Sequence, residues 1–433
     1  MGMGGVQRTA KFVKYLPDFG WEPYVLTTTP KVYLARDECL FKEVENIAKI
    51  YRTGHPENSR GTNSKDNHKD NSRENGHTVV KFKNDSNRKL LSNIAQTFLI
   101  PDSKIFWKAA AIKLAEKIIR DEKIDLIYAT APPYTDFLIA SELKKTFGLP
   151  MVIDYRDSWI DCPNNFYPTS FHKERHRKLE TKVLKCADRI VTINSRIKEL
   201  IHYRYNFVPE SDIEIIPQGF DQEDFDRQKP GIQRQGKMRI TYSGSFLNYY
   251  TPKYFLDGLA QVFKKRPELK DKIEALFIGT FPEEFVEYIE QLGISGSVNI
   301  AGYVEHSLCI KYLLESDILW MMINKTERSD LHSTGKLYEY FGARKPILAC
   351  VPEGVARESL KDYGAVTLTG PDDSGAISKA IEEFYEQYEK NNLPVPDENM
   401  ILKYDRKKLA CELASQFDLV KNSVKHETIL SPH

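Results

Sequence analysis

Cysteine is scarce in this 433-residue sequence, and its placement excludes two kinds of scaffold. The six cysteines are scattered and no two of them form a C-x-x-C pair, so neither a zinc cage nor a disulfide framework is indicated. His172 and His176 are four positions apart, but the basic residues around them favour a solvated helix face over a metal site. We therefore expect no metal and no cofactor, and cysteines that are mostly small core residues.

Long apolar runs and an excess of one charge are also absent. The run at 318–323 is among the longest, against the ~20 residues that a bilayer-spanning helix needs. Lys and Arg number 62 against 61 Asp and Glu, a net charge of +1, whereas a nucleic-acid protein needs a basic excess on its binding face. The N-terminus lacks the pattern of a signal peptide. Composition thus favours a cytoplasmic protein with no nucleic-acid partner.

What the sequence does contain is an alternation of short β-branched runs with longer helical patterns. Nearly continuous apolar strands of this kind are typical of parallel sheets that helices cover on both faces. This pattern predicts an α/β fold built from two Rossmann-like, doubly wound domains. The expected strands are 24–28, 79–82, 126–130, 151–155, 189–193 and 213–217 in the first half, and 239–243, 275–279, 298–301, 318–322, 346–350 and 365–368 in the second.

Composition also suggests where the domains end. A polar stretch with Pro and Gly at 221–237 reads as a linker between an N-terminal domain, 1–220, and a C-terminal domain, 238–402. Residues 403–433 carry the apolar spacing of one last amphipathic helix. Residues 54–77 have no aliphatic or aromatic side chain, so we expect a disordered surface loop there. Two such domains leave a cleft at the carboxyl ends of their sheets, where ligands bind.

The first candidate site is at the N-terminus. Gly4 and Gly5 precede a helical pattern, and glycines there let an anion approach the backbone amides of a helix start; a flexible terminus is the alternative. A strand normally precedes such a turn, so either one β-strand lies upstream of Met1 or the first domain lacks its central strand. Arg8, Lys11 and Lys14 recur every three residues, as a stripe that could meet anionic lipid head groups at a membrane surface or simply face solvent.

The second candidate site follows the buried strand 151–155. Ionised groups just beyond a parallel strand lie at the ligand-binding edge of the sheet. Asp154 and Arg156 share one side of the extended chain and Asp157 faces the other. These side chains could position an acceptor hydroxyl and take up its proton, or form a purely structural salt bridge.

The third candidate site opens a helix after the strand 318–322. Ser333, Thr334 and Gly335 offer backbone donors at the helix start and Lys336 adds a positive charge, which suits a diphosphate. The spacing is not that of a P-loop. Glu339 is one turn further on the same side, where a carboxylate could accept both hydroxyls of a ribose. An ordinary helix N-terminus is the alternative.

A companion loop follows the first strand of the second half. Gly244 and Ser245 would expose backbone donors at the same edge, and Lys253 could supply a charge for phosphate. Tyr303 ends a further strand there, where a planar base could pack.

In this order and spacing the chain resembles the retaining glycosyltransferases of family 4, which have the two-domain GT-B architecture. Their pattern covers almost the whole chain, and the matching stretches are 4–8 with 16–21, 100–107, 131–133, 154–159, Glu180 with 187–189, 217–221, 242–246, 302–304 and 335–349.

The resemblance implies a UDP- or GDP-sugar donor, bound mainly by the C-terminal domain, and a glycan or lipid-linked acceptor held by the N-terminal domain. Transfer would be metal-independent and would retain the anomeric configuration. By the same resemblance Glu339 would bind the ribose, residues 334–336 the diphosphate, and Gly4 and Gly5 the donor phosphates or sugar. The final helix would return to the N-terminal domain. We expect a role in surface-polysaccharide or lipopolysaccharide assembly.

The sequence departs from the family pattern at two positions. The family places a second glutamate, which contacts the donor sugar, eight positions before the one that is here Glu339, and that position is Leu331. Either Asp330 or His332 beside it takes over this contact, or backbone amides alone bind the sugar. The family often has His before Asp where this chain has Arg156. Two alternatives therefore stand beside the transferase: an isomerase that resembles UDP-sugar 2-epimerases, and a non-catalytic nucleotide-sugar-binding protein.

Overall fold

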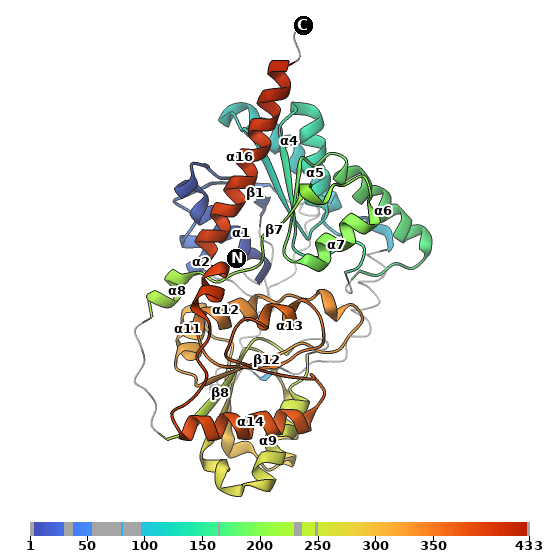
Figure 1. The fold of residues 1–433 in the computed structure, drawn as a ribbon. Coiled ribbons are helices and arrows are strands. Elements are labelled where there is room, and N and C mark those ends of the chain that lie inside the picture. The colour runs from blue at the N-terminus through green and yellow to red at the C-terminus, as the bar shows by residue number, and fades with distance from the viewer. Residues whose placement is uncertain are drawn as a thin grey trace, which may run out of the picture. The chain divides into compact units, whose positions relative to one another are not determined.

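The computed structural model describes residues 4–29, 38–53, 79–80, 97–162, 165–228, 236–246 and 250–430 (Figure 1). These residues fall into two compact units. Unit 1 takes in the described parts of Met1–Asn67, Asp85–Pro217 and Arg406–His433, and unit 2 those of His68–Asn84 and Gln218–Asp405. The expected loop at 54–77 is outside the described residues.

Unit 1 carries two parallel sheets. The larger has the order β4-β5-β6-β7, and the smaller pairs β1 with β2. The strands are β1 (Tyr24–Thr28), β2 (Lys49–Thr53), β4 (Ile127–Ala131), β5 (Met151–Tyr155), β6 (Arg189–Thr192) and β7 (Ile213–Ile215). The helices are α1 (Gly4–Tyr15), α2 (Glu38–Lys42), α4 (Lys108–Glu122), α5 (Thr135–Phe147), α6 (Ser170–Leu184), α7 (Ser195–Arg204) and α16 (Arg406–Leu430).

The last helix belongs to unit 1, as the fold prediction required. Leu409, Leu413 and Phe417 of α16 form one apolar cluster with Phe12 of α1 and Val152 of β5. These α16 residues recur every four positions and are buried, which is why an amphipathic helix forms here. A helix from the far end of the chain thus covers the sheet that begins with β4.

Unit 2 is a six-stranded parallel sheet with the order β11-β9-β8-β12-β13-β14. Its strands are β8 (Met238–Ser243), β9 (Ile273–Ile278), β11 (Val298–Gly302), β12 (Ile318–Met322), β13 (Ile347–Cys350) and β14 (Val366–Thr369). Its helices are α8 (Gln222–Asp226), α9 (Lys253–Lys265), α10 (Glu283–Gln291), α11 (His306–Leu314), α12 (Gly335–Ala343), α13 (Val355–Leu360), α14 (Ser374–Glu389) and α15 (Glu398–Ile401). A two-residue strand, β10 (Phe281–Pro282), pairs with β3 (Val79–Val80).

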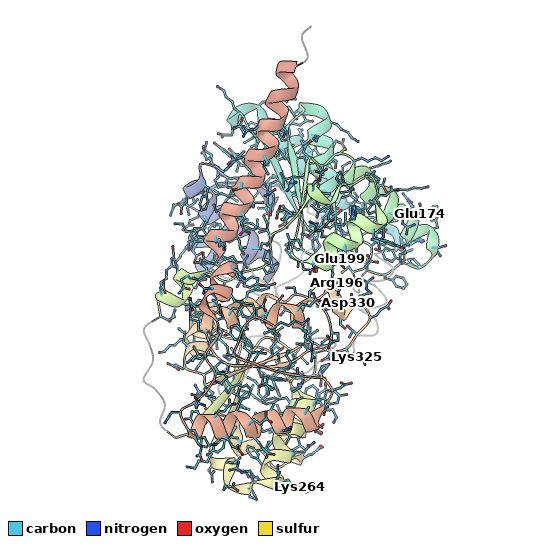
Figure 2. The ribbon with its side chains drawn as sticks, in the orientation of Figure 1. Glu174, Arg196, Glu199, Lys264, Lys325 and Asp330 are labelled. Atoms are coloured by element: carbon cyan, nitrogen blue, oxygen red, sulfur yellow. The ribbon has the colours of Figure 1, made fainter. Side chains whose placement is uncertain are left out.

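The order of this sheet reverses between β8 and β12, because the chain first builds outward to β11 and then crosses back to β12. Loops at the carboxyl ends of the two central strands separate there and leave room for a ligand. Apolar side chains fill both faces of the sheet, while charged ones such as Glu174 of α6 in unit 1 and Lys264 of α9 in unit 2 point outward (Figure 2). The α/β fold with two Rossmann-like units agrees with the prediction.

The expected linker at 221–237 differs from the structure in its first part. Residues 222–226 form α8, whose cap is the Asp221 carboxylate, which accepts from the Glu223 amide. Phe225 is buried against Gly342 of α12, where a Cβ would come within 2.4 Å of its ring. Because Phe225 is the one aromatic residue in a polar stretch, the sequence did not indicate a helix there. Residues 229–235 are outside the described part of the chain.

Candidate functional site

The start of α12 in unit 2 is arranged to receive an anion. Thr334 is its N-cap residue, and the Thr334 Oγ1 atom is buried with no hydrogen-bond partner among the described residues. A Cβ built on Gly335 would meet open space. Amides at a helix start carry partial positive charge, so a phosphate oxygen fits here. Ser333 is engaged differently, since its hydroxyl is 2.6 Å from the Tyr338 hydroxyl.

Lys336 and Gly244 come together beside this helix start. The Lys336 ammonium donates to the Tyr242 hydroxyl at 2.6 Å and lies 4.4 Å from the centre of the Tyr242 ring. A Cβ on Gly244 would collide with the end of the Lys336 side chain, so the glycine is what lets the ammonium reach the end of β8. Burial lowers the pKa of Lys336 to about 8, against the smaller opposing effects of Tyr250 and Glu339.

Glu339 is on the same side of α12 as Lys336. Its Oε1 atom is 3.0 Å from Nε2 of His306, the first residue of α11. The sequence pattern pointed to Glu339 but not to His306. A pattern along one helix predicts neighbours three or four positions apart, whereas His306 comes from a helix 33 residues earlier in the chain.

Of the other predicted donor residues, Ser245 and Lys253 have local partners in the structure, whereas Tyr303 is exposed. The Ser245 hydroxyl accepts from the Thr280 amide at 3.2 Å. Lys253 pairs with Asp257 at 2.7 Å and also contacts Tyr288, so its charge is compensated within its own surroundings. Tyr303 follows β11 with 57% of its surface exposed, which leaves its ring available to a planar base.

In unit 1, Arg156 is the centre of the second predicted site. Its guanidinium donates to the Pro132 carbonyl, and a Cβ on Gly5 would collide with it. Gly5 is in the first turn of α1, which begins at Gly4, so the structure brings these two predicted residues together. The Arg156 Nε atom is buried and has no partner within the described part of the chain.

Two carboxyl groups adjoin this arginine. Asp157 follows β5 and is exposed to solvent, yet neighbouring protein atoms displace enough water to raise its pKa to about 6, against the pull of Arg156. Asp136, in the first turn of α5, was not predicted. Burial, aided by the charge of Asp102, raises its pKa to about 8, and its Oδ1 atom has no partner among the residues described. Only its place just after β4 could have drawn attention to it.

Comparisons with known proteins identify the family of this chain. The family model Glycosyltransferase Family 4 matches residues 71–224, and Glycosyl transferases group 1 matches residues 222–395, so the two together span most of the chain. The chain belongs to the glycosyltransferase group 1 family of GT-B enzymes. No curated protein matches it in sequence.

Solved structures share the fold of this glycosyltransferase at low sequence identity. A glycosyltransferase from Rickettsia africae is 15% identical with a TM-score of 0.61, and 98% of this chain and 96% of that chain are covered. HepE from Anabaena, in complex with UDP-glucose, is 14% identical with a TM-score of 0.56 and 99% and 97% coverage. The lipopolysaccharide outer core galactosyltransferase WaaB is 15% identical with a TM-score of 0.56 and 98% and 96% coverage.

The structure corrects the assignment of Asp154 in this glycosyltransferase. Asp154 is fully buried and accepts from Arg8 Nε at 2.8 Å and Nη2 at 3.0 Å, and from the Tyr128 hydroxyl at 2.7 Å. Arg8 also donates to the carbonyls of Ile216 and Pro217 at the end of β7. These contacts favour a structural salt bridge over a catalytic role, with Arg8 as the partner in place of the expected Arg156.

The expected basic stripe along α1 is also wrong as a surface feature. Arg8 is 0% exposed and Lys11 is 4% exposed, and Lys11 pairs with Glu43 at 2.7 Å. The side chain of Lys14 is 10% exposed and its ammonium lies over the Tyr15 ring. Spacing along a helix says which residues share a face, but not whether that face meets solvent, and here it meets the interior of unit 1.

Both departures from the family pattern are visible. Leu331, at the position of the missing glutamate, is buried. Next to it, Asp330 pairs with Arg328 at 3.4 Å, and burial lowers the pKa of the partly buried His332. Arg156 occupies the other position and binds the Pro132 carbonyl. That Asp330 or His332 contacts the donor sugar stays a prediction, as does its alternative, binding by backbone amides alone.

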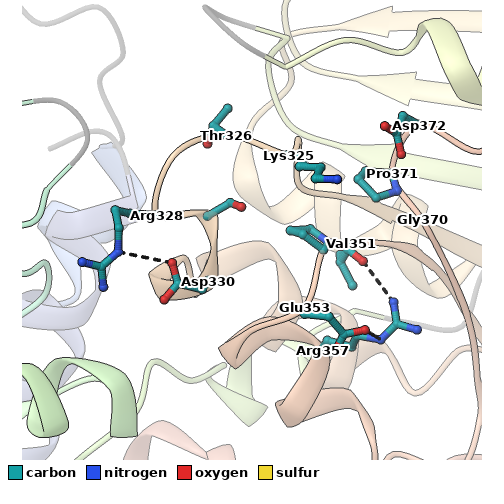
Figure 3. A pocket seen from close by; sticks show the side chains of 12 residues that line it. Lys325, Thr326, Arg328, Asp330, Val351, Glu353, Arg357, Gly370, Pro371 and Asp372 are labelled. Carbon is teal, nitrogen blue, oxygen red and sulfur yellow. Dashed lines mark hydrogen bonds and ion pairs between the residues drawn. The ribbon is translucent and has the colours of Figure 1, made fainter.

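A separate cavity of about 430 Å³ opens at the carboxyl ends of β12, β13 and β14 (Figure 3). Its wall carries three basic and three acidic side chains, Asp330 among them, and none of the residues predicted for the donor nucleotide lines it. Arg357 pairs with Glu353 at 3.1 Å and Arg328 with Asp330. Because the cations are balanced by carboxylates within the wall, this cavity is a poor place for a diphosphate.

Two absences concern the described residues alone. Within them, no group of three or more His, Cys, Asp or Glu side chains could hold a metal ion. Nor does any helix in those parts of the chain have the length and apolar character needed to cross a bilayer.

Proposed function

We propose that this glycosyltransferase takes a sugar from a UDP- or GDP-sugar bound by unit 2 and transfers it, with retention and without a metal, to a glycan or lipid-linked acceptor bound by unit 1. The observation that carries the proposal is the start of α12, where the unpartnered Thr334 hydroxyl, the open Gly335 backbone and the Lys336 ammonium offer donors to one diphosphate.

Two further residues of unit 2 complete the proposed site for the sugar nucleotide. Glu339 accepts the ribose hydroxyls one turn along α12, and the exposed Tyr303 ring packs on the base. The structure of HepE supports a UDP-sugar in particular, because that protein is in complex with UDP-glucose.

For the acceptor, unit 1 offers Arg156 and the two carboxyl groups beside it. Asp157, with a pKa of about 6, is mostly ionised at neutral pH, so it accepts a hydrogen bond from the attacking hydroxyl and positions it. We assign the reaction to surface-polysaccharide or lipopolysaccharide assembly in the cytoplasm, a role supported by the likeness to WaaB. Peripheral contact with the membrane would need residues other than Arg8 and Lys11, which are buried.

The test is calorimetric titration of the full chain with UDP-, GDP- and ADP-sugars. We expect one nucleotide class to bind, and Lys336→Met to weaken that binding at least tenfold, about 1.4 kcal/mol. The matched control is Lys264→Met, an exposed lysine of α9, which should bind like the wild type. Equal affinity in the wild type and Lys336→Met, or no binding of any sugar nucleotide, would refute the assignment of the donor to α12.

Turnover separates the transferase from an epimerase on the same fold. A transferase releases nucleoside diphosphate only when an acceptor is present, whereas an epimerase converts the donor alone. Conversion of the donor to an isomeric sugar nucleotide without acceptor would contradict the proposal.

A further inference from the structure

The pair between His306 and Glu339 joins two helices of unit 2 at the predicted ribose position. The Nε2 and Oε1 atoms are 3.0 Å apart, with 27% of the His306 side chain and 17% of the Glu339 side chain exposed. A carboxylate only accepts hydrogen bonds, so His306 carries a proton on Nε2 and donates it. The contact therefore fixes the direction in which the carboxylate of Glu339 is held.

The backbone around this pair is fixed by further contacts at the end of β8. The Ser243 amide donates to the Tyr340 hydroxyl of α12 at 2.9 Å, and the Ser243 hydroxyl is 3.1 Å from the Cys309 sulfur of α11. The Tyr340 hydroxyl in turn donates to the Trp320 carbonyl of β12 at 3.0 Å. These hydrogen bonds connect both helices to the central strands and so fix the backbone positions from which His306 and Glu339 meet.

We propose that His306 is a positioning residue which aims the Glu339 carboxylate at the ribose, and that the pair makes the site select ribonucleotides over 2′-deoxyribonucleotides. This inference rests on the proposed function, since it takes the donor nucleotide to be bound at α12. A carboxylate offers several lone-pair positions, so one that accepts from His306 can also accept from a sugar hydroxyl.

The ratio of the affinities for a ribonucleotide and for its 2′-deoxy form distinguishes a positioning role of His306 from a purely structural ion pair. A site built to hydrogen-bond a hydroxyl discriminates against an analogue that lacks it, because its own polar group is left unpaired. If His306 aims Glu339, its loss weakens the ribonucleotide alone. If the pair only braces α11 against α12, its loss weakens both nucleotides by the same factor.

The first step of the experiment is calorimetric titration of the wild type with UDP, GDP and ADP. The nucleotide that binds most tightly is then compared with its 2′-deoxy form in the wild type and in His306→Leu, His306→Gln and Glu339→Gln. We expect the wild type to prefer the ribonucleotide by about tenfold or more. His306→Leu should reduce the preference to about twofold or less, with binding of the deoxy form unchanged.

Two variants serve as controls. His306→Gln should keep most of the preference, because its amide nitrogen can still donate. His202→Leu makes the same replacement at an exposed histidine of unit 1 and should not alter it. Melting temperatures establish that each variant folds, and His306→Ala replaces His306→Leu should the latter unfold.

The outcomes separate this inference from the proposed function. Failure of all three nucleotides to bind would overturn both. Binding without any preference for the ribonucleotide, or an equal loss of both forms in His306→Leu, would overturn the role of His306 alone and leave the donor site of unit 2 intact.

Discussion

The lowered pKa of Lys336 makes donor binding depend on pH above neutrality. Burial lowers the pKa of this lysine to about 8 in the free protein. A bound diphosphate favours the charged ammonium and so raises the pKa again. Binding is then coupled to proton uptake, and the donor affinity should be nearly independent of this group well below pH 8 and fall as pH rises through and above pH 8.

The size of the effect follows from linkage. With a free pKa of about 8 and a bound pKa well above 9, the fraction of charged Lys336 in the free protein falls about tenfold between pH 7 and pH 9. The dissociation constant of the donor nucleotide should rise by the same factor, about 1.4 kcal/mol. At pH 8 binding should take up about half a proton.

Isothermal titration calorimetry measures both quantities. Dissociation constants at pH 7, 8 and 9 give the slope, and titrations at pH 8 in two buffers of different ionisation enthalpy give the proton uptake. Lys336→Met removes the titrating group and should bind weakly with no such slope, while Lys264→Met should behave as the wild type. A change of less than twofold across this range, or the same slope in Lys336→Met, would refute the reasoning.

Four further predictions concern three other residues and the expectation that the reaction needs no metal. Glu339→Ala should weaken donor binding at least tenfold, about 1.4 kcal/mol, by calorimetry, and a loss below twofold would remove Glu339 from the site. Asp157→Asn should reduce turnover far more than donor affinity, and equal activity would leave that carboxylate with a structural role only. Chelation with EDTA should leave the transfer rate unchanged, and a loss that Mg²⁺ or Mn²⁺ restores would contradict a metal-independent reaction. Arg8→Met should lower the free energy of unfolding in urea by about 3–5 kcal/mol, because Asp154 is left buried without its cation; a change below 1 kcal/mol would show that the pair is dispensable.

The strands of both units were predictable because buried parallel strands are short, apolar and separated by helical patterns. The runs at 151–155 and 318–322 appear at the predicted residues as β5 and β12. The strand β2 was missed, since Lys49 and Arg52 are on a partly exposed strand with no continuous apolar run. Helix α8 was missed for a similar reason, as one buried Phe225 gives no periodic signal.

The candidate site was predictable only where its residues are close in sequence. Lys336 and Glu339 share one side of α12 and were identified together, whereas His306 and Asp136 were not identified. His306 lies beside a predicted residue of unit 2 and Asp136 beside one of unit 1, because within each unit separate strands end at one edge of a sheet, a relation that no local spacing records.

The sequence by itself determined the class of this protein, through its alternating apolar strands and amphipathic helices and through the family pattern. Tertiary structure decided what each charged residue does. Asp154 and Arg8 are 146 positions apart and became a buried ion pair, and Lys336 became an ammonium with a lowered pKa beside Tyr242. The physical reason is that burial and the partners of a charge set its protonation and its role, and both depend on contacts between distant parts of the chain.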